Sequence, residues 1–278
     1  MIVNADAMQV YRDLAILTAR PNAADEAAVP HLLYGTVDAA EAHSVAAWLE
    51  SAREALARAA AEGRRPIVVG GTGLYLAALT EGLSAIPPVP EPVRAHWRAR
   101  QAAEPAEALH AALARADPGM AARLRPSDPQ RIVRALEVME ATGRSLADWQ
   151  GERTPPLIEP GRDVLRVVVA PPRPLLRERI ARRFDQMVAA GAVEEAAALA
   201  ARGLDPALPA MKAIGVRLLA AYAAGEIDLP AAVSRAVTDT RQYAKRQETW
   251  FRNQFADWQR ITGPEEGEAL IAEVGRSN

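Results

Sequence analysis

Asp6 is the first side chain in this sequence that is placed to do chemistry. It comes just after the short apolar run Ile2–Asn4, which predicts a strand. Parallel α/β sheets hold their ligands beyond the carboxyl ends of the strands, so this carboxylate is placed to act as a general base or beside a magnesium ion. A turn or helix cap is the alternative role for a lone aspartate after a strand.

A glycine-rich loop follows the next predicted strand. The apolar run Pro66–Val69 leads into Gly70–Gly73, with the sequence GGTG. Glycines let the backbone approach a ligand closely and expose its N–H groups, although a tight turn needs glycine too. Because the carboxyl ends of parallel strands share one edge of a sheet, we expect Asp6 and the Thr72 hydroxyl to face one site.

Two pairs of arginines have the spacing of one helical face. Arg131 and Arg134 lie beside Gln130, and two guanidinium groups with an amide suit an RNA loop. Arg179 and Arg183 are four residues apart and could close over a pyrophosphate. Each pair also fits an ordinary solvent-exposed helix face, and the residues alone leave both interpretations open.

Two further basic segments lie nearer the C-terminus. Lys212–Arg217 (KAIGVR) places Gly215 between two cations, where glycine permits a tight backbone. The helix predicted over Arg241–Arg252 interleaves basic residues with Tyr243 and Trp250. This composition suits a nucleic-acid backbone, unless the aromatic residues belong to the hydrophobic core.

The composition narrows the possible functions. The chain has 278 residues, 50% of them hydrophobic, and a net charge of −2, which gives no global sign of nucleic-acid binding. It contains no cysteine, which excludes disulfides, zinc–thiolate sites and thiol nucleophiles, and its four histidines are scattered, which argues against a histidine metal site. No apolar run is long enough to span a membrane and no signal-peptide pattern is present, so we predict a cytoplasmic protein.

The order of the predicted elements indicates an α/β core with an insertion. Residues 1–83 read as strand, helix, strand, helix, with Ser44 as a helix cap and Pro66–Val69 as a buried parallel strand. The proline-rich stretch Ile86–Pro92 opens residues 84–160, which read as helices only.

The α/β character returns in residues 161–278, which are mostly helical. Thr154–Pro160 is a second proline-rich boundary, and Leu165–Val169 is a predicted strand. A strong helix over Pro174–Ala190 follows, with further helices to about Phe255 and a small acidic tail. We therefore predict an α/β core that is interrupted by a helical insertion domain.

Together these segments resemble the tRNA dimethylallyltransferase family, the isopentenyl transferases that modify adenosine 37 beside the anticodon. The matches run in family order over nearly the whole chain, and they are specific as an ensemble. They are Asn4–Tyr11, Thr18–Pro21, Gly70–Tyr75, Asp128–Glu137, Arg179–Met187, Lys212–Arg217 and Ala244–Trp250.

The resemblance implies a P-loop NTPase-like parallel sheet of the nucleotide- and ATP-binding kind. Its helical insertion would grip the tRNA anticodon stem-loop. The implied reaction transfers a dimethylallyl group from dimethylallyl diphosphate to N6 of the tRNA adenosine, with Mg2+ accompanying the diphosphate. The resemblance further implies a monomer that works without a membrane.

The family's site residues carry over position by position. Asp6 matches the catalytic base, which takes a proton from the amine of a flipped-out adenosine. Thr72 matches a catalytic residue near that base, and Arg183, with Arg179, matches the catalytic diphosphate clamp. The matches to tRNA contacts are Asp6, Ala7, Met8, Gln9, Thr72, Arg94, Gln130, Arg131, Ile132, Val133, Arg134, Lys212, Ala213, Ile214, Gly215, Val216 and Arg217.

One feature of the family has no counterpart in this sequence. Family members carry a strand, a G-x-x-x-x-G-K-[ST] phosphate loop and a helix ahead of the segment that matches residues 4–11, and this motif occurs nowhere in the 278 residues. We expect either a misassigned start and a longer natural chain, or a shortened gene copy, and a sheet without its first strand. We expect little or no prenylated tRNA from this chain. A non-catalytic tRNA-binding remnant is the alternative function, and the same missing loop argues against a small-molecule kinase.

Overall fold

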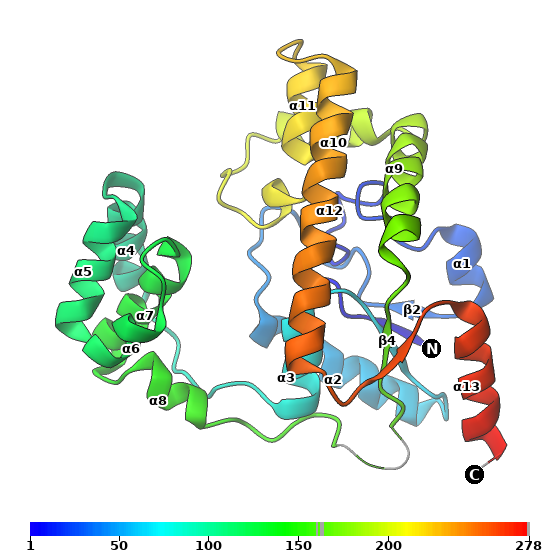
Figure 1. The fold of residues 1–278 in the computed structure, drawn as a ribbon, viewed down its shortest axis with the longest axis horizontal. Helices are drawn as coiled ribbons and strands as arrows, with labels where there is room; N and C mark the ends of the chain where they lie inside the picture. The colour runs from blue at the N-terminus through cyan, green and yellow to red at the C-terminus, as the bar shows by residue number, and fades with distance from the viewer. Residues whose placement is uncertain (160, 162–163, 277–278) are drawn as a thin grey trace. The chain divides into compact units, whose positions relative to one another are not determined.

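The chain forms two compact units (Figure 1). In this computed structural model, residues 1–159, 161 and 164–276 are described. One unit consists of Met1–Ala78 and Pro160–Asn278, and the other of Leu79–Glu159. Pro160, at the end of the second predicted boundary, lies outside the described residues.

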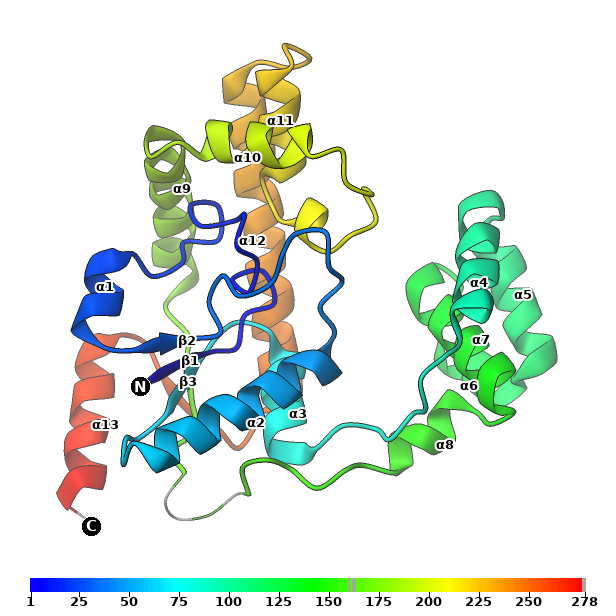
Figure 2. The ribbon, with the colours of Figure 1, turned by 180° about the vertical axis from the view of Figure 1, so that it is seen from behind.

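The first unit, here called the α/β unit, contains a three-stranded parallel sheet (Figure 2). Its order is β2-β1-β3, and the pairing places Asn4 opposite Val69. The predicted strand at residues 2–4 is confirmed, whereas β2 was not predicted. The strands and the helices that precede and follow them are β1 (Ile2–Asn4), α1 (Ala23–Ala28), β2 (His31–Leu32), α2 (Val45–Ala61), β3 (Ile67–Val69) and α3 (Gly73–Glu81).

A second, two-stranded parallel sheet lies in the same unit. It pairs β4 (Val167–Val169) with β5 (Gln259–Ile261), and α13 (Pro264–Arg276) follows. The predicted strand Leu165–Val169 is confirmed in its last three residues. Beyond Phe255 the sequence suggested only an acidic tail, so β5 and α13 are additions from the structure.

The prediction that β3 is a buried strand was wrong. Ile67 is 53% exposed and Val69 is 49% exposed, and Val169 of β4 is 64% exposed. Within the described residues, β3 pairs only with β1 and β4 only with β5, so both strands have an unpaired edge. An apolar composition shows that a strand suits burial, but it does not show whether a neighbouring element covers it.

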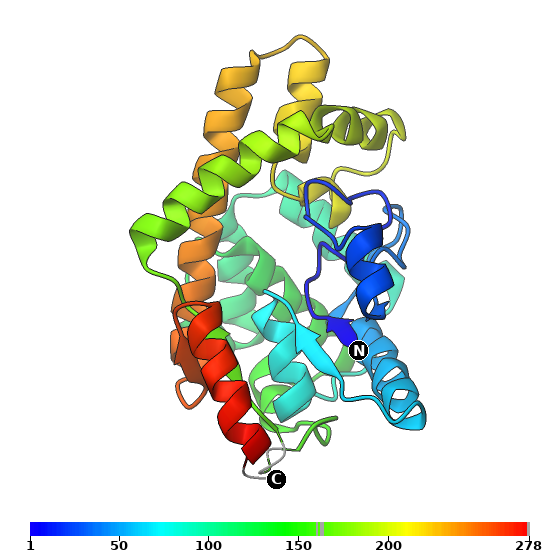
Figure 3. The ribbon, with the colours of Figure 1, turned by 90° about the vertical axis from the view of Figure 1, so that its right-hand side faces the viewer.

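Long helices form the rest of the α/β unit (Figure 3). They pack α9 against α12 and α10 against α11, around a core that includes Phe184 and Leu219. The helix predicted over residues 174–190 is confirmed, because Phe184 is buried and Ile180 and Met187 pack against the same core. The elements are α9 (Arg173–Ala189), α10 (Ala192–Ala201), the 3-10 turn η1 (Ala210–Lys212), α11 (Val216–Ala223) and α12 (Leu229–Gln254).

The second unit, here called the helical unit, has a hydrophobic core of its own. Leu109, Leu113, Ile132 and Leu136 are among its most buried side chains. Its helices are α4 (Glu91–Ala103), α5 (Ala106–Ala116), α6 (Pro118–Arg123), α7 (Pro129–Thr142) and α8 (Leu146–Gly151).

The central helix of that unit, α7, has well-defined ends. The Asp128 side chain accepts a hydrogen bond from the Arg131 backbone N–H at 3.2 Å, and Pro129 occupies the first helical position. Gly143 ends the helix with a φ of 67°, in the left-handed region that favours glycine.

Candidate active site

The structure brings Asp6 and the glycine-rich loop together at one edge of the sheet. The Ala5 N–H donates to the Val69 carbonyl at 2.8 Å, and the Thr72 N–H donates to the Ala5 carbonyl at 3.2 Å. The Ala7 N–H then donates to Oγ1 of Thr72 at 2.9 Å. The predicted neighbourhood of Asp6 and Thr72 is confirmed, because parallel pairing of β1 with β3 places both loops at the carboxyl ends of the strands.

The Asp6 carboxylate combines both roles that the sequence left open. Oδ1 accepts hydrogen bonds from the backbone N–H groups of Met8 at 2.8 Å and Gln9 at 3.3 Å, as a turn cap does. In the described part of the chain no donor bonds to Oδ2, which lies 3.4 Å from the point that a Cβ atom would occupy at Gly71. One oxygen therefore fixes the carboxylate, and the other is left for a ligand.

Asn4 is a site residue that the sequence did not single out. Its side chain is fully buried, accepts from the Asp6 N–H at 2.8 Å and donates to the Leu33 carbonyl at 3.1 Å. Its own carbonyl accepts from Nε1 of Trp48 at 2.9 Å. The signal available in the sequence was an amide at the end of an apolar strand, because a buried amide needs polar partners.

Two glycines of the loop are needed for close packing inside the protein. A Cβ atom at Gly70 would lie 2.1 Å from the backbone of Ala5, and one at Gly73 would lie 2.2 Å from the Trp250 ring. Nε2 of Gln247 donates to the Gly71 carbonyl at 2.8 Å. The loop is thus clamped between β1 and α12, which fixes the place of Thr72.

Three tyrosines lie within the electrostatic influence of Asp6. Burial raises the pKa of Tyr34, Tyr75 and Tyr243, and the negative charge of Asp6 raises each further. The Tyr75 hydroxyl is buried without a hydrogen-bond partner among the described residues, and its ring stacks on Trp48 with centroids 4.4 Å apart. The charge of Asp6 and partial desolvation therefore both favour the protonated form of these three phenols.

The two candidate clamp arginines lie on the exposed face of α9. Arg179 and Arg183 are exposed and make no ion pair within the described residues. Their neighbour Arg182 lies 3.8 Å from Glu178. Unpaired guanidinium groups suit an anionic ligand, and the ion pair distinguishes Arg182 from them.

The Lys212–Arg217 segment packs between α9 and the loop that follows Asp6. Gly215 has a φ of +94°, and a Cβ atom there would lie 3.0 Å from Cδ2 of Leu17 and 3.3 Å from the Phe184 ring. Lys212 and Arg217 are exposed. Ala213, Gly215 and Val216 are buried, so the side chains that this segment offers to a ligand are mainly its two cations.

Only some residues of the matched segment 130–134 are exposed on α7. Gln130 and Arg131 are exposed and Arg134 is half-buried. Ile132 and Val133 are 0% and 5% exposed, because they point into the core of the helical unit. Their side chains therefore occupy core positions, and a tRNA contact at these two residues stays a prediction. The remaining candidate of this unit, Arg94 on α4, is half-buried and makes no ion pair within the described residues.

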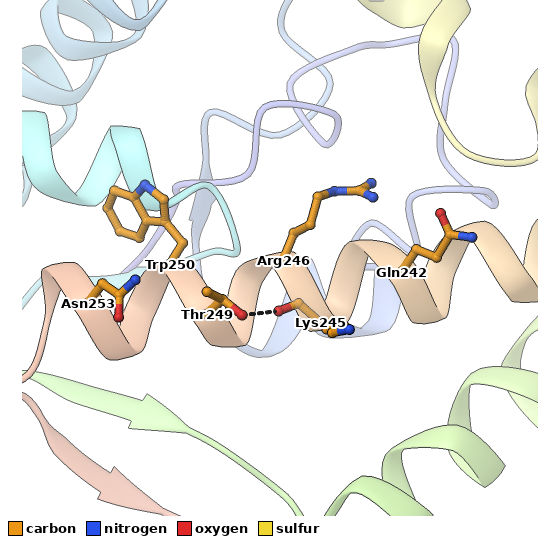
Figure 4. A pocket seen from close by; sticks show the side chains of 6 residues that line it. All are labelled: Gln242, Lys245, Arg246, Thr249, Trp250 and Asn253. Carbon is orange, nitrogen blue, oxygen red and sulfur yellow. Dashed lines mark hydrogen bonds between the residues drawn. The ribbon is translucent and has the colours of Figure 1, made fainter. Parts of the chain in front are cut away.

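Helix α12 carries a pocket of about 470 Å³ along one face, lined by Gln242, Lys245, Arg246, Thr249, Trp250 and Asn253 (Figure 4). The sequence left open whether the aromatic residues of this helix are exposed or belong to the hydrophobic core, and the structure shows one of each kind. The ring centroids of Trp250 and Phe255 lie 5.0 Å apart, and the Phe255 ring stacks on Trp258 with centroids 4.1 Å apart. These three residues therefore pack against one another in an aromatic cluster. Tyr243 is 37% exposed, with the Arg246 guanidinium 5.8 Å from its ring.

A family model described as IPP transferase matches residues 9–254, across both units. The chain belongs to the IPP transferase family. The P-loop-like α/β fold predicted from the sequence is the fold of this IPP transferase. Within the described residues, none of its helices is long and apolar enough to cross a membrane.

Relatives of this IPP transferase are similar over most of its length. A tRNA dimethylallyltransferase of Rhodopseudomonas palustris is 55% identical over 273 residues, covering 98% of this chain and 84% of the relative. One of Nitrobacter hamburgensis is 54% identical, covering 98% of this chain and 85% of the relative.

Two solved structures share the fold. A tRNA isopentenylpyrophosphate transferase of Bacillus halodurans is 34% identical with a TM-score of 0.63, covering 94% of this chain and 80% of that one. A eukaryotic dimethylallyltransferase acting on tRNA is 26% identical with a TM-score of 0.75, covering 90% of this chain and 63% of that one.

Proposed function

We propose that this protein transfers a dimethylallyl group from dimethylallyl diphosphate to N6 of adenosine 37 in tRNA. The observation that carries the proposal is Asp6, a carboxylate held at the carboxyl edge of the sheet with one oxygen that accepts no hydrogen bond from the described residues. The same chain is 55% identical to a protein named tRNA dimethylallyltransferase.

The proposed chemistry is a substitution at the first carbon of the prenyl group. The bond from N6 to that carbon forms while the carbon–oxygen bond to the diphosphate breaks, and the electron pair leaves with pyrophosphate. Oδ2 of Asp6 takes the proton from N6, because a neutral adenine amine is a poor nucleophile. Thr72 holds the Ala7 backbone, and with it the turn that carries Asp6.

Arg179 and Arg183, which make no ion pair with any described residue, would neutralise the charge that develops on the pyrophosphate. The described residues contain no group of three acidic or histidine side chains that could hold a metal by themselves. Mg2+ binds through one or two carboxylates together with phosphate oxygens, so we propose a magnesium ion that arrives with the diphosphate.

The proposed tRNA partner is recognised through its anticodon stem-loop. The exposed side chains of α7, with Arg94, Lys212 and Arg217, supply cations and an amide for a phosphate backbone and unpaired bases. One chain carries all of these residues, so we propose that a monomer is sufficient. Because tRNA is the substrate, we place the reaction in the cytoplasm.

A product assay tests the proposal. The purified chain is incubated with dimethylallyl diphosphate and an anticodon stem-loop, and the digested RNA is searched by mass spectrometry for N6-(dimethylallyl)adenosine. A matched stem-loop with inosine at position 37 lacks the amine. Product from the adenosine stem-loop alone supports the transferase.

The exposed side chains of α7, with Lys212 and Arg217, also suit a second candidate, a tRNA-binding protein without transfer activity. It predicts binding of both stem-loops and no product. A chain that neither binds the stem-loops nor forms product contradicts both candidates.

A further inference from the structure

A carboxylate from α10 holds the turn at residues 14–19, which follows Asp6 in the sequence. Oε2 of Glu195 accepts hydrogen bonds from the N–H groups of Ala15 at 2.7 Å and Ile16 at 2.8 Å, and Oε1 accepts from Leu17 at 2.8 Å. Three successive N–H groups form a concave anion site. In this protein the anion is a side chain about 180 residues away in the sequence.

The same turn fixes the Gln9 side chain. Thr18 closes the turn by donating from Oγ1 to the Leu14 carbonyl at 2.5 Å. Nε2 of Gln9 donates to the carbonyls of Thr18 at 3.0 Å and Ala19 at 3.1 Å. Within the described residues no donor bonds to Oε1 of Gln9, so this oxygen is left to accept a hydrogen bond from RNA.

Helix α10 makes a second tie to this region at its other end. Arg202, which caps the helix, bonds to Asp13 at 2.5 Å and to Asp38 at 2.7 Å. Asp13 also accepts from the Ala39 N–H at 3.1 Å. Residues 13–17 therefore contact α10 at two points, through Arg202 and through Glu195. Of the two, Glu195 is closer to Gln9 in the hydrogen-bond network, because it holds the turn whose carbonyls accept from the Gln9 side chain.

We infer that Glu195 is a positioning residue for tRNA binding, which sets the direction of the Gln9 amide through the turn at residues 14–19. The inference rests on the proposed function, because Gln9 is a proposed tRNA contact. Without the carboxylate, three buried or half-buried N–H groups lose their acceptor and the turn must rearrange. Gln9 then loses both carbonyl acceptors that hold it.

The test compares three variants of the full chain. Glu195→Gln keeps the size of the side chain but replaces one acceptor oxygen with an amino group. Glu195→Asp keeps the charge on a shorter stem. Glu194→Gln is the matched control, because Glu194 lies in the same first turn of α10, is exposed, and makes no hydrogen bond within the described residues. Stem-loop affinity, hydrogen exchange of residues 11–21 and the melting temperature are measured for each.

We expect Glu195→Gln to weaken stem-loop binding about tenfold and to speed hydrogen exchange at residues 15–17. Glu195→Asp should recover part of both effects, and Glu194→Gln should show neither. Faster exchange with unchanged affinity would reduce Glu195 to a structural role and overturn the inference. A wild-type chain that does not bind the stem-loop would overturn the proposed function first, and that result is visible before any variant is made.

Discussion

The Asp6 edge of the α/β unit and the α7 face of the helical unit hold their polar side chains in different ways. At the Asp6 edge the bonds join distant parts of the sequence, as between Ala7 and Thr72. On α7 the partners lie within one turn: Arg131 is 3.4 Å from Asp128, and Arg134 is 3.5 Å from Glu137.

This difference separates a site made by the tertiary fold from a site carried by one helix. The geometry around Asp6 exists only when β1, β3 and α12 are assembled. The arginines of α7 need only an intact helix. The Arg131–Asp128 pair is exposed and worth little, so Arg131 can exchange its carboxylate for a phosphate at small cost, whereas Arg134 pairs with the mostly buried Glu137. Variants at the Asp6 edge should therefore change chemistry or folding, and variants on α7 should change mainly affinity.

The largest expected effect comes from Asp6→Ala. In a version of the chain that forms product, we expect the transfer rate to fall about 1,000-fold, which lies within the usual range for the loss of a general base, with stem-loop affinity changed less than threefold. Single-turnover transfer and equilibrium binding are measured together. Asp185→Ala on exposed α9 is the control and should match wild type. A loss of affinity at an unchanged rate would remove Asp6 as the base.

Asn4→Ala should destabilise the α/β unit by about 2–3 kcal/mol, because the Asp6 N–H and the Leu33 carbonyl lose a buried partner. Denaturant unfolding gives the free energy, and hydrogen exchange shows where it is lost. We expect faster exchange at residues 1–9 and unchanged exchange in residues 79–159. An equal loss of hydrogen-exchange protection in both units would contradict the conclusion that Asn4 stabilises the α/β unit alone.

The double variant Arg131→Ala with Arg134→Ala should weaken stem-loop binding about tenfold. The slope of log affinity against log salt concentration should fall by the amount expected for the loss of roughly one to two phosphate contacts. The melting temperature should fall modestly, because Arg134→Ala leaves the carboxylate of Glu137, whose side chain is only 10% exposed, without its ion pair, whereas the Arg131–Asp128 pair is exposed and worth little. Replacing Arg115 and Arg123, on α5 and α6, is the matched control. If the two double variants lose affinity equally, α7 has no special role.

The smallest expected effect is a pH dependence at His43. Burial lowers the pKa of His43 below its ordinary value of 6.5, and the opposing charge of Glu41 is the smaller influence. The unfolded chain then binds a proton more readily than the folded one, so this contribution is full above pH 6.5 and is lost as the pH falls through the folded pKa. Melting temperatures between pH 5 and 8 should decline less at low pH in His43→Gln than in wild type. Identical profiles would show that His43 does not contribute.

Sequence reasoning reached the features that depend on local pattern. The helix predicted over Pro174–Ala190 is α9, the helical character of residues 84–160 includes α7, and the meeting of Asp6 with Thr72 followed from the parallel strand order. Strand β2 has only two residues, His31 and Leu32, and β5 begins with the polar Gln259 and Arg260, so neither strand forms the apolar run that revealed β1, β3 and β4.

Long-range polar contacts were out of reach for another reason. The side chains of Asn4 and Glu195 bond to backbone groups. Because every residue type carries these groups, no complementary pair of side chains in the sequence indicates the contacts. The apolar spacing of the helix predicts that Ile132 is buried, whereas the burial of Val133 was missed because a matched motif names positions without saying which side of the helix they face.

The exposed, one-sided strand β3 has a consequence for how this protein behaves in a test tube. Ile67 and Val69 present about half of their surface on a strand whose outer backbone groups lack a partner in the described residues. Such an edge is a template for strand addition by another molecule. Concentrated solutions should therefore scatter light increasingly with time, and Ile67→Lys should slow this self-association because a charged edge resists the addition of further strands.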